Sequence, residues 1–93
     1  MGTAARKVRG GKLLRVRLEH DGSVITKVLI TGDFFLHPEE GLVKLEGELL
    51  GTPLQESEQD LALRIEAILA EKRLTVLGFG PGDLAATIKE AGA

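Results

Sequence analysis

The chain has 93 residues, 43% of them hydrophobic, and a formal net charge of −2 at pH 7. This length and balance predict one small folded domain over residues 1–93 and exclude a disordered chain. The absence of cysteine excludes disulfides, thiol catalysis and cysteine-held metal sites. No apolar run approaches the length of a membrane span, and the N-terminus lacks a signal-peptide core, so we expect a cytoplasmic protein with no membrane partner.

Charge is segregated along the sequence. Residues 1–17 carry six bases and no acid, a net of +6, whereas residues 18–93 carry the other six bases and all 14 acids, a net of −8. Such a basic segment binds nucleic acid, nucleotide phosphate or an acidic protein surface, or is simply solvated. We expect residues 1–10 to form a flexible basic arm.

Alternating apolar residues predict a half-buried strand over residues 11–20, with one face formed by Leu14, Val16 and Leu18. Asp21-Gly22 predicts a tight hairpin turn. The second strand, from about residue 24 to 31, has apolar residues on both faces and is expected to be central in its sheet. A short apolar piece, Phe34-Phe35-Leu36, predicts a third strand or a bulged continuation of the second.

Three helices are predicted in the second half of the chain. The first opens at Pro38-Glu39-Glu40 and is closed by Gly51. The second spans about residues 57–72 and starts at a capping-box pattern, and the third follows Gly80-Pro81-Gly82. Between them, residues 74–79 are predicted to be extended. Strands followed by helices predict an α+β fold of two layers, a small antiparallel β-β-β sheet with helices packed on one face.

The only compact set of titratable residues is Asp33, His37, Glu39 and Glu40. One hypothesis is a self-contained enzyme in which Asp33 orients His37 as a general base. The alternative is that these groups cap a strand end and the first turn of a helix. The two histidines lack a metal-binding spacing, so we assign no catalytic residue and no metal site.

Residues 10–40, GGKLLRVRLEHDGSVITKVLITGDFFLHPEE, resemble the accessory domain of lipoate-protein ligases. The matching parts, in order, are Gly11-Lys12-Leu13, the Asp21-Gly22 hairpin, Gly32-Asp33-Phe34-Phe35 and Pro38-Glu39-Glu40, with a weaker similarity over residues 78–88. In that family the domain is either the C-terminal part of the ligase or a separate small subunit.

The resemblance implies a fold similar to the SufE/NifU-like fold of Fe–S scaffold and sulfur-acceptor proteins. It also implies a non-catalytic subunit that forms a heterodimer with the catalytic ligase subunit. That subunit binds ATP, Mg²⁺ and lipoate, makes lipoyl-AMP and transfers the lipoyl group to acceptor domains. The accessory subunit enables the adenylation step and is expected to bind no cofactor alone.

Together, the resemblance and the basic segment give candidates for contact with the partner or proximity to the adenylate: Gly11, Lys12, Leu13, Arg15, Asp33, Phe34, Phe35 and His37. Lys12 is expected to approach a nucleotide phosphate or a carboxylate of the catalytic subunit, with solvation at a strand edge as the alternative. The residues from Asp33 to His37 are expected to order a loop at the interface. A different function, in which residues 6–17 bind nucleic acid or serve regulation, lacks the interleaved aromatic residues that stack on bases.

Overall fold

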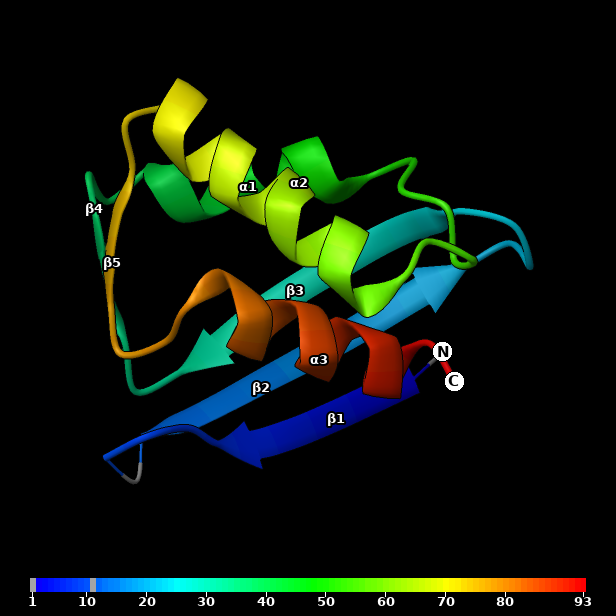
Figure 1. Ribbon diagram of the computed structural model, residues 1–93, viewed down its shortest axis with the longest axis horizontal. Helices are drawn as coiled ribbons and strands as arrows, with labels where there is room; N and C mark the ends of the chain where they lie inside the picture. The colour runs from blue at the N-terminus through cyan, green and yellow to red at the C-terminus, as the bar shows by residue number, and fades with distance from the viewer. Residues whose placement is uncertain (1, 11) are drawn as a thin grey trace.

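A computed structural model describes residues 2–10 and 12–93. The elements in chain order are β1 (Gly2–Lys7), β2 (Leu13–His20), β3 (Ile25–Gly32), β4 (Phe35–His37), α1 (Gly41–Leu49), α2 (Glu58–Glu71), β5 (Thr75–Leu77) and α3 (Pro81–Ala91) (Figure 1). Antiparallel strands form a main sheet of order β1-β2-β3, and β4 pairs with β5 in a second, two-stranded sheet. The predicted α+β class is confirmed, whereas the SufE/NifU-like comparison stays a prediction.

The hydrophobic core lies between one face of the main sheet and the helices. Helix α3 packs on β1 and β2, α1 packs on β3, and α2 packs on both of these helices. The alternation predicted for β2 is present, since its inward side chains are buried and its outward ones are not. The core also includes Leu45 and Leu49 of α1, Leu61 and Ile65 of α2, and Leu84 and Ile88 of α3.

The helix termini follow local capping chemistry. The Ser57 hydroxyl accepts a hydrogen bond from the Asp60 amide, 3.0 Å away, as the capping pattern predicts. Helix α1 begins at Gly41, later than predicted, because residues 35–37 are still paired with β5. The amide of Gly41 then donates to the carbonyl of Pro38 in a turn, at 2.9 Å.

The prediction of a flexible arm over residues 1–10 is wrong. Residues 2–7 form β1, which pairs antiparallel with β2 along its whole length. At Gly2 the strand lies so close to α3 that an added Cβ would be 1.7 Å from the carbonyl oxygen of Ala91. Arg6 forms an ion pair with Glu90 of the same helix. The N-terminal segment is therefore an integral strand.

Two further expectations about the strands are wrong. The central strand is β2, and β3 lies at an edge of the main sheet. That edge is protected, because the Glu46 carboxylate accepts from the Ile30 amide at 2.8 Å and the Thr52 carbonyl accepts from the Ile25 amide at 3.0 Å. The third strand of the main sheet is β1, and the short piece predicted at residues 34–36 belongs to the second sheet instead.

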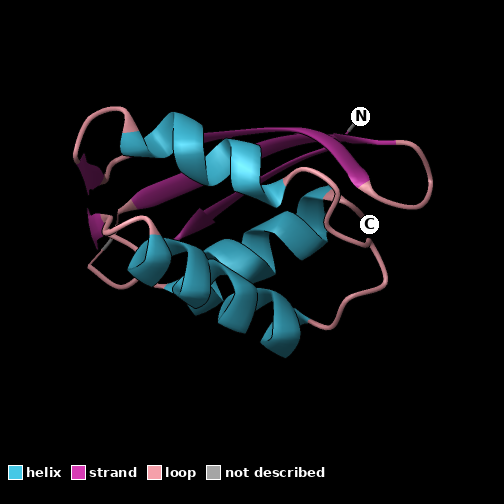
Figure 2. Cartoon of the chain, turned by 90° about the horizontal axis from the view of Figure 1, so that it is seen from above, coloured by secondary structure: helices cyan, strands magenta, loops and turns pink. Residues whose placement is uncertain are grey.

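The β4–β5 sheet lies at one end of the molecule, and the first strand begins and the last helix ends at the other. Figures 1 and 2 both place the start of β1 and the end of α3 at the same end of the molecule, with the short strands β4 and β5 at the other end. The β1–β2 connection lies at the β4–β5 end in Figure 1. Within the described residues, every helix is too short or too polar to cross a membrane.

Candidate partner-binding site

An open groove of about 790 Å³ lies at the β4–β5 end of the molecule. Three segments that are distant in the sequence form it: the β1–β2 connection, the β3–β4 turn and the end of β5 (Figure 1). The lining residues are Gly10, Lys12, Gly32, Asp33, Phe34, Phe35, Leu77 and Gly78.

The backbone segments that line this groove pack closely against one another at two glycines. Gly32 has a φ of +144° and Gly78 a φ of +119°, in the region that favours glycine. An added Cβ would lie 2.1 Å from the Leu13 carbonyl oxygen at Gly32, and 3.0 Å from the Asp33 carbonyl oxygen at Gly78. The Asp33 amide also donates to the Leu13 carbonyl at 2.8 Å, which ties the turn to β2. The two glycines therefore permit the approach of the three segments.

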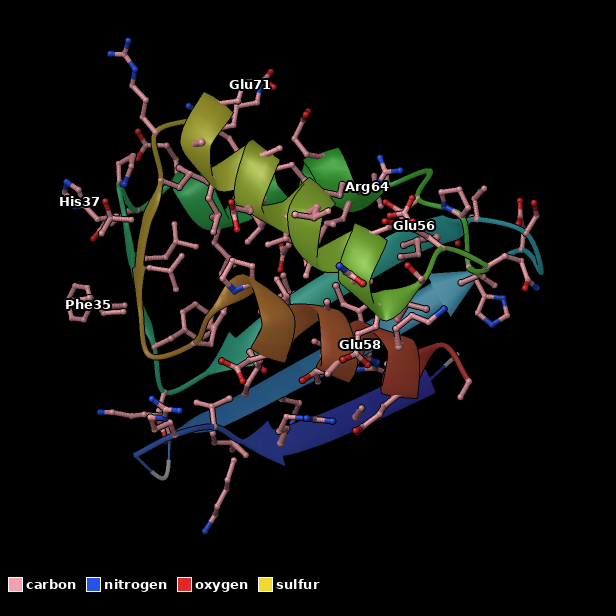
Figure 3. The ribbon with its side chains drawn as sticks, in the orientation of Figure 1. Phe35, His37, Glu56, Glu58, Arg64 and Glu71 are labelled. Atoms are coloured by element: carbon pink, nitrogen blue, oxygen red, sulfur yellow. The ribbon has the colours of Figure 1, made fainter. Side chains whose placement is uncertain are left out.

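Two adjacent phenylalanines, one just before β4 and one at its first residue, differ in exposure. Phe34 is half-buried and meets Phe79 edge to face, with ring centroids 5.0 Å apart and an interplanar angle of 81°. Phe35 is 75% exposed, and it lies opposite Leu77, which is 68% exposed. We call this pair the Phe35–Leu77 patch. Figure 3 shows Phe35 and His37 extending away from the body of the molecule.

The Phe35–Leu77 patch has the composition of a protein-interface centre. An aromatic and an aliphatic side chain are exposed side by side, and the same groove presents Lys12 and Asp33. Apolar anchors with a polar rim are typical of surfaces that bind another protein, because the anchors lose water on contact while the rim sets orientation.

Of the eight candidates from the sequence, four meet in the groove: Lys12, Asp33, Phe34 and Phe35. Leu13 and Arg15 lie on β2, on the sheet face away from the helices, and His37 lies on β4 outside the groove lining. Gly11 lies outside the described residues. Leu77 also lines the groove but is not among these candidates, because its only signal in the sequence was its place in the extended 74–79 segment.

The acid–base hypothesis for Asp33 and His37 gains no support from the geometry. Both side chains are exposed, and in the described part of the chain no hydrogen bond or ion pair joins them. No group of three or more His, Asp or Glu side chains suited to holding a metal ion occurs among the described residues either.

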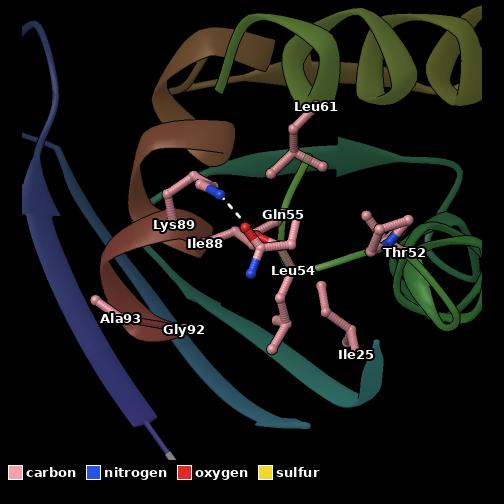
Figure 4. A pocket seen from close by; sticks show the side chains of 10 residues that line it. Ile25, Thr52, Leu54, Gln55, Leu61, Ile88, Lys89, Gly92 and Ala93 are labelled. Atoms are coloured by element: carbon pink, nitrogen blue, oxygen red, sulfur yellow. Dashed lines mark hydrogen bonds between the residues drawn. The ribbon is translucent and has the colours of Figure 1, made fainter. Parts of the chain in front are cut away.

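A second, smaller pocket of about 290 Å³ lies near the chain termini (Figure 4). The Lys89 ammonium there donates to the carbonyls of Leu54 and Glu56, both at 2.8 Å. The Glu56 carboxylate receives two hydrogen bonds from Arg64, at 2.8 and 2.6 Å, and this contact lowers the pKa of Glu56 and raises that of Arg64. These polar groups join the α1–α2 loop to α2 and α3.

Two of three comparisons with known proteins find similarity to the same kind of protein. No protein-family model matches the chain. In sequence the chain is similar to lipoate-protein ligase A subunit 2 of Thermoplasma acidophilum, with 42% identity over 43 residues. That match covers 46% of this chain and 46% of the relative, so it spans about half of the relative's length.

The fold comparison covers more of the molecule. The chain is similar to a chain in the structure of a bipartite lipoate protein ligase and its E2 lipoyl domain from Thermoplasma acidophilum, with a TM-score of 0.75 and 27% identity. The match covers 92% of this chain and 91% of that one. Sequence and fold together support the resemblance to an accessory small subunit of a bipartite lipoate-protein ligase.

Proposed function

We propose that this chain is a non-catalytic accessory subunit that associates with the catalytic subunit of a lipoate-protein ligase. The observation that carries the proposal is the similarity in fold, over 92% of the chain, to a chain of a bipartite ligase. The identity of 42% over 43 residues with a ligase subunit 2 points the same way. The Phe35–Leu77 patch and its groove supply a surface suited to this association.

The association enables ATP-dependent activation of lipoate to lipoyl-AMP. In this proposal ATP, Mg²⁺ and lipoate bind to the catalytic subunit, and lipoyl acceptor domains reach the accessory subunit only through the complex. A subunit that binds one conformation of its partner more tightly shifts the partner's equilibrium by that difference in affinity. A tenfold difference corresponds to about 1.4 kcal/mol, and this favours the adenylating conformation.

Four residues of the groove and His37 of β4, which lies outside it, have distinct parts in the proposed contact. Phe35 and Leu77 insert into an apolar site on the catalytic subunit, because both are exposed here and gain from burial. The Lys12 ammonium, exposed beside them, meets a carboxylate or a nucleotide phosphate. Asp33 and His37 order the partner loop at the two sides of the patch.

The direct test is lipoate-dependent ATP–pyrophosphate exchange by the catalytic subunit of the same organism, with and without this chain. We expect exchange only when both proteins are present, together with a complex in sedimentation analysis. A catalytic subunit that is fully active alone, or two proteins that do not associate, would refute the proposal.

A pair of double variants tests the patch itself. Phe35→Ser with Leu77→Ser should raise the concentration needed for half-maximal exchange about tenfold or more, as expected for loss of an interface anchor. The matched control is Val43→Ser with Leu63→Ser, because these side chains on α1 and α2 are 72% and 57% exposed. Equal effects of the two pairs would remove the patch from the interface.

Lys12→Ala is a separate test of the charged rim. Its side chain is exposed, so the fold should be retained. We expect reduced lipoate activation at a fixed subunit concentration. Unchanged exchange would exclude Lys12 from the mechanism and leave solvation at a strand edge as its role.

A further inference from the structure

The face of the main sheet that points away from the helices is uncovered in the described part of the chain. On its central strand, Arg15 lies between Ala5 and Thr31, and Arg17 lies between Thr3 and Leu29. We call this surface the arginine face. Its members are Thr3, Ala5, Lys7, Leu13, Arg15, Arg17, Glu19, Lys27, Leu29 and Thr31.

The charge of the arginine face is opposite to that of the whole chain. Four cations and the single acid Glu19 give it a formal charge of +3, in a protein whose net charge is −2. Arg15 forms no hydrogen bond or ion pair with any residue that the structure describes. Its cross-strand neighbours Ala5 and Thr31 are small, so its guanidinium group stands clear of cover and can bind a carboxylate through two hydrogen bonds.

The other residues of this face favour a protein partner over a nucleic acid. Leu29 is 46% exposed beside Arg17, which adds apolar area to the charged centre. All three phenylalanines lie elsewhere, at positions 34, 35 and 79, so the face has no aromatic ring for stacking on a base. Arginine with exposed aliphatic area is typical of protein interfaces.

The arginine face is continuous with the groove. Leu13 pairs with Lys7 at the end of the face, and the next residue back along the chain, Lys12, lines the groove. We propose that the arginine face binds a carboxylate-rich surface of the catalytic subunit, so that one partner covers both the groove and the sheet. This inference rests on the proposed function above, and it adds a second surface and its chemistry.

Charge reversal with a matched control tests the inference. Arg15→Glu changes the charge on the arginine face, and Lys44→Glu makes the same change on the exposed side of α1. Affinity for the catalytic subunit is measured by titration calorimetry at about 50 and 300 mM salt, since screening weakens exposed charge pairs. We expect Arg15→Glu to weaken binding about tenfold or more at low salt and to flatten the salt dependence, with Lys44→Glu unchanged. Arg15→Gln, which keeps a polar side chain, should give an intermediate loss of affinity. This variant keeps the test valid if Arg15→Glu does not fold.

Each other outcome has a defined meaning. If the wild-type chain does not bind the catalytic subunit, the proposed function fails and this inference fails with it. If the wild type binds and neither Arg15 variant changes the affinity, only the arginine face is refuted. A third outcome is that the wild type binds mixed-sequence DNA or RNA at low salt, and that Arg15→Glu abolishes this binding but still binds the catalytic subunit. The arginine face would then be a nucleic-acid-binding surface, and the inference would be overturned.

Discussion

The shape of the groove depends on single backbone positions, and Gly78 is the clearest. It follows β5 with a φ of +119°, and the space for a Cβ is already occupied by Phe34 and the Asp33 carbonyl, about 3 Å away. A side chain at this position meets both an unfavourable backbone conformation and a steric contact. The residue thus sets the distance between β5 and the β3–β4 turn.

Gly78→Ala should therefore lower the free energy of unfolding by about 1–3 kcal/mol, the usual cost of a residue held in a disfavoured backbone region. The control is Gly47→Ala in α1, where an added Cβ meets nothing within 4 Å. That change should raise stability by about 0.5–1 kcal/mol, because alanine is the better helix former. Urea unfolding followed by circular dichroism measures both. Two equal values would show that the groove backbone is not constrained at Gly78.

At the scale of elements, the α1–α2 loop is connected to two helices by charged groups. Glu56 binds Arg64 of α2 through its carboxylate and Lys89 of α3 through its carbonyl. The Arg64 contact lowers the pKa of Glu56 below its ordinary value of 4.5. A carboxyl group whose pKa is lower in the folded state stabilises the fold above its unfolded pKa, and this contribution is lost as pH falls through the folded pKa.

Glu56→Gln should make the stability less dependent on pH in the acid range. Because Arg64 is 41% exposed, the ion pair contributes at most about 1 kcal/mol. The wild type should exceed the variant by this amount at pH 6, and the difference should shrink as the pH falls below 4.5 and through the lowered pKa of folded Glu56. The lowered pKa of Asp21 is common to both proteins and cancels in the comparison. Urea unfolding at several pH values is the measurement, and parallel curves would contradict the prediction.

How far each element could be predicted depends on whether its signal is local. Helix α2 was predicted nearly to the residue, because the Ser57 cap and the apolar stripe lie within the segment itself. The pairing of Phe35 with Leu77 joins two three-residue strands from distant parts of the chain, and no local pattern encodes it. Four residues that line the groove, Lys12, Asp33, Phe34 and Phe35, were accordingly predicted as contact candidates, whereas Leu77 was not.

On the scale of the whole molecule, β1 determines whether the sheet has two or three strands. Its sequence, GTAARK, has no large apolar residue, and for this reason the segment was predicted to be a flexible basic arm. Its stability comes from other elements, namely hydrogen bonds to β2 and the close approach of α3 at Gly2 and Arg6. The same strand completes the arginine face through Thr3, Ala5 and Lys7.

Deleting residues 1–7 distinguishes a strand from an arm. A chain of 93 residues has about 5–14 kcal/mol of stability in total, and the deletion removes one of three strands together with a surface on which α3 packs. We expect most of the cooperative urea transition to be lost. Arg6→Gln, which removes only the ion pair with Glu90, should cost at most about 1 kcal/mol, because both side chains are exposed. A truncated chain as stable as the full one would mean that β2 and β3 alone support the helices and that β1 is peripheral.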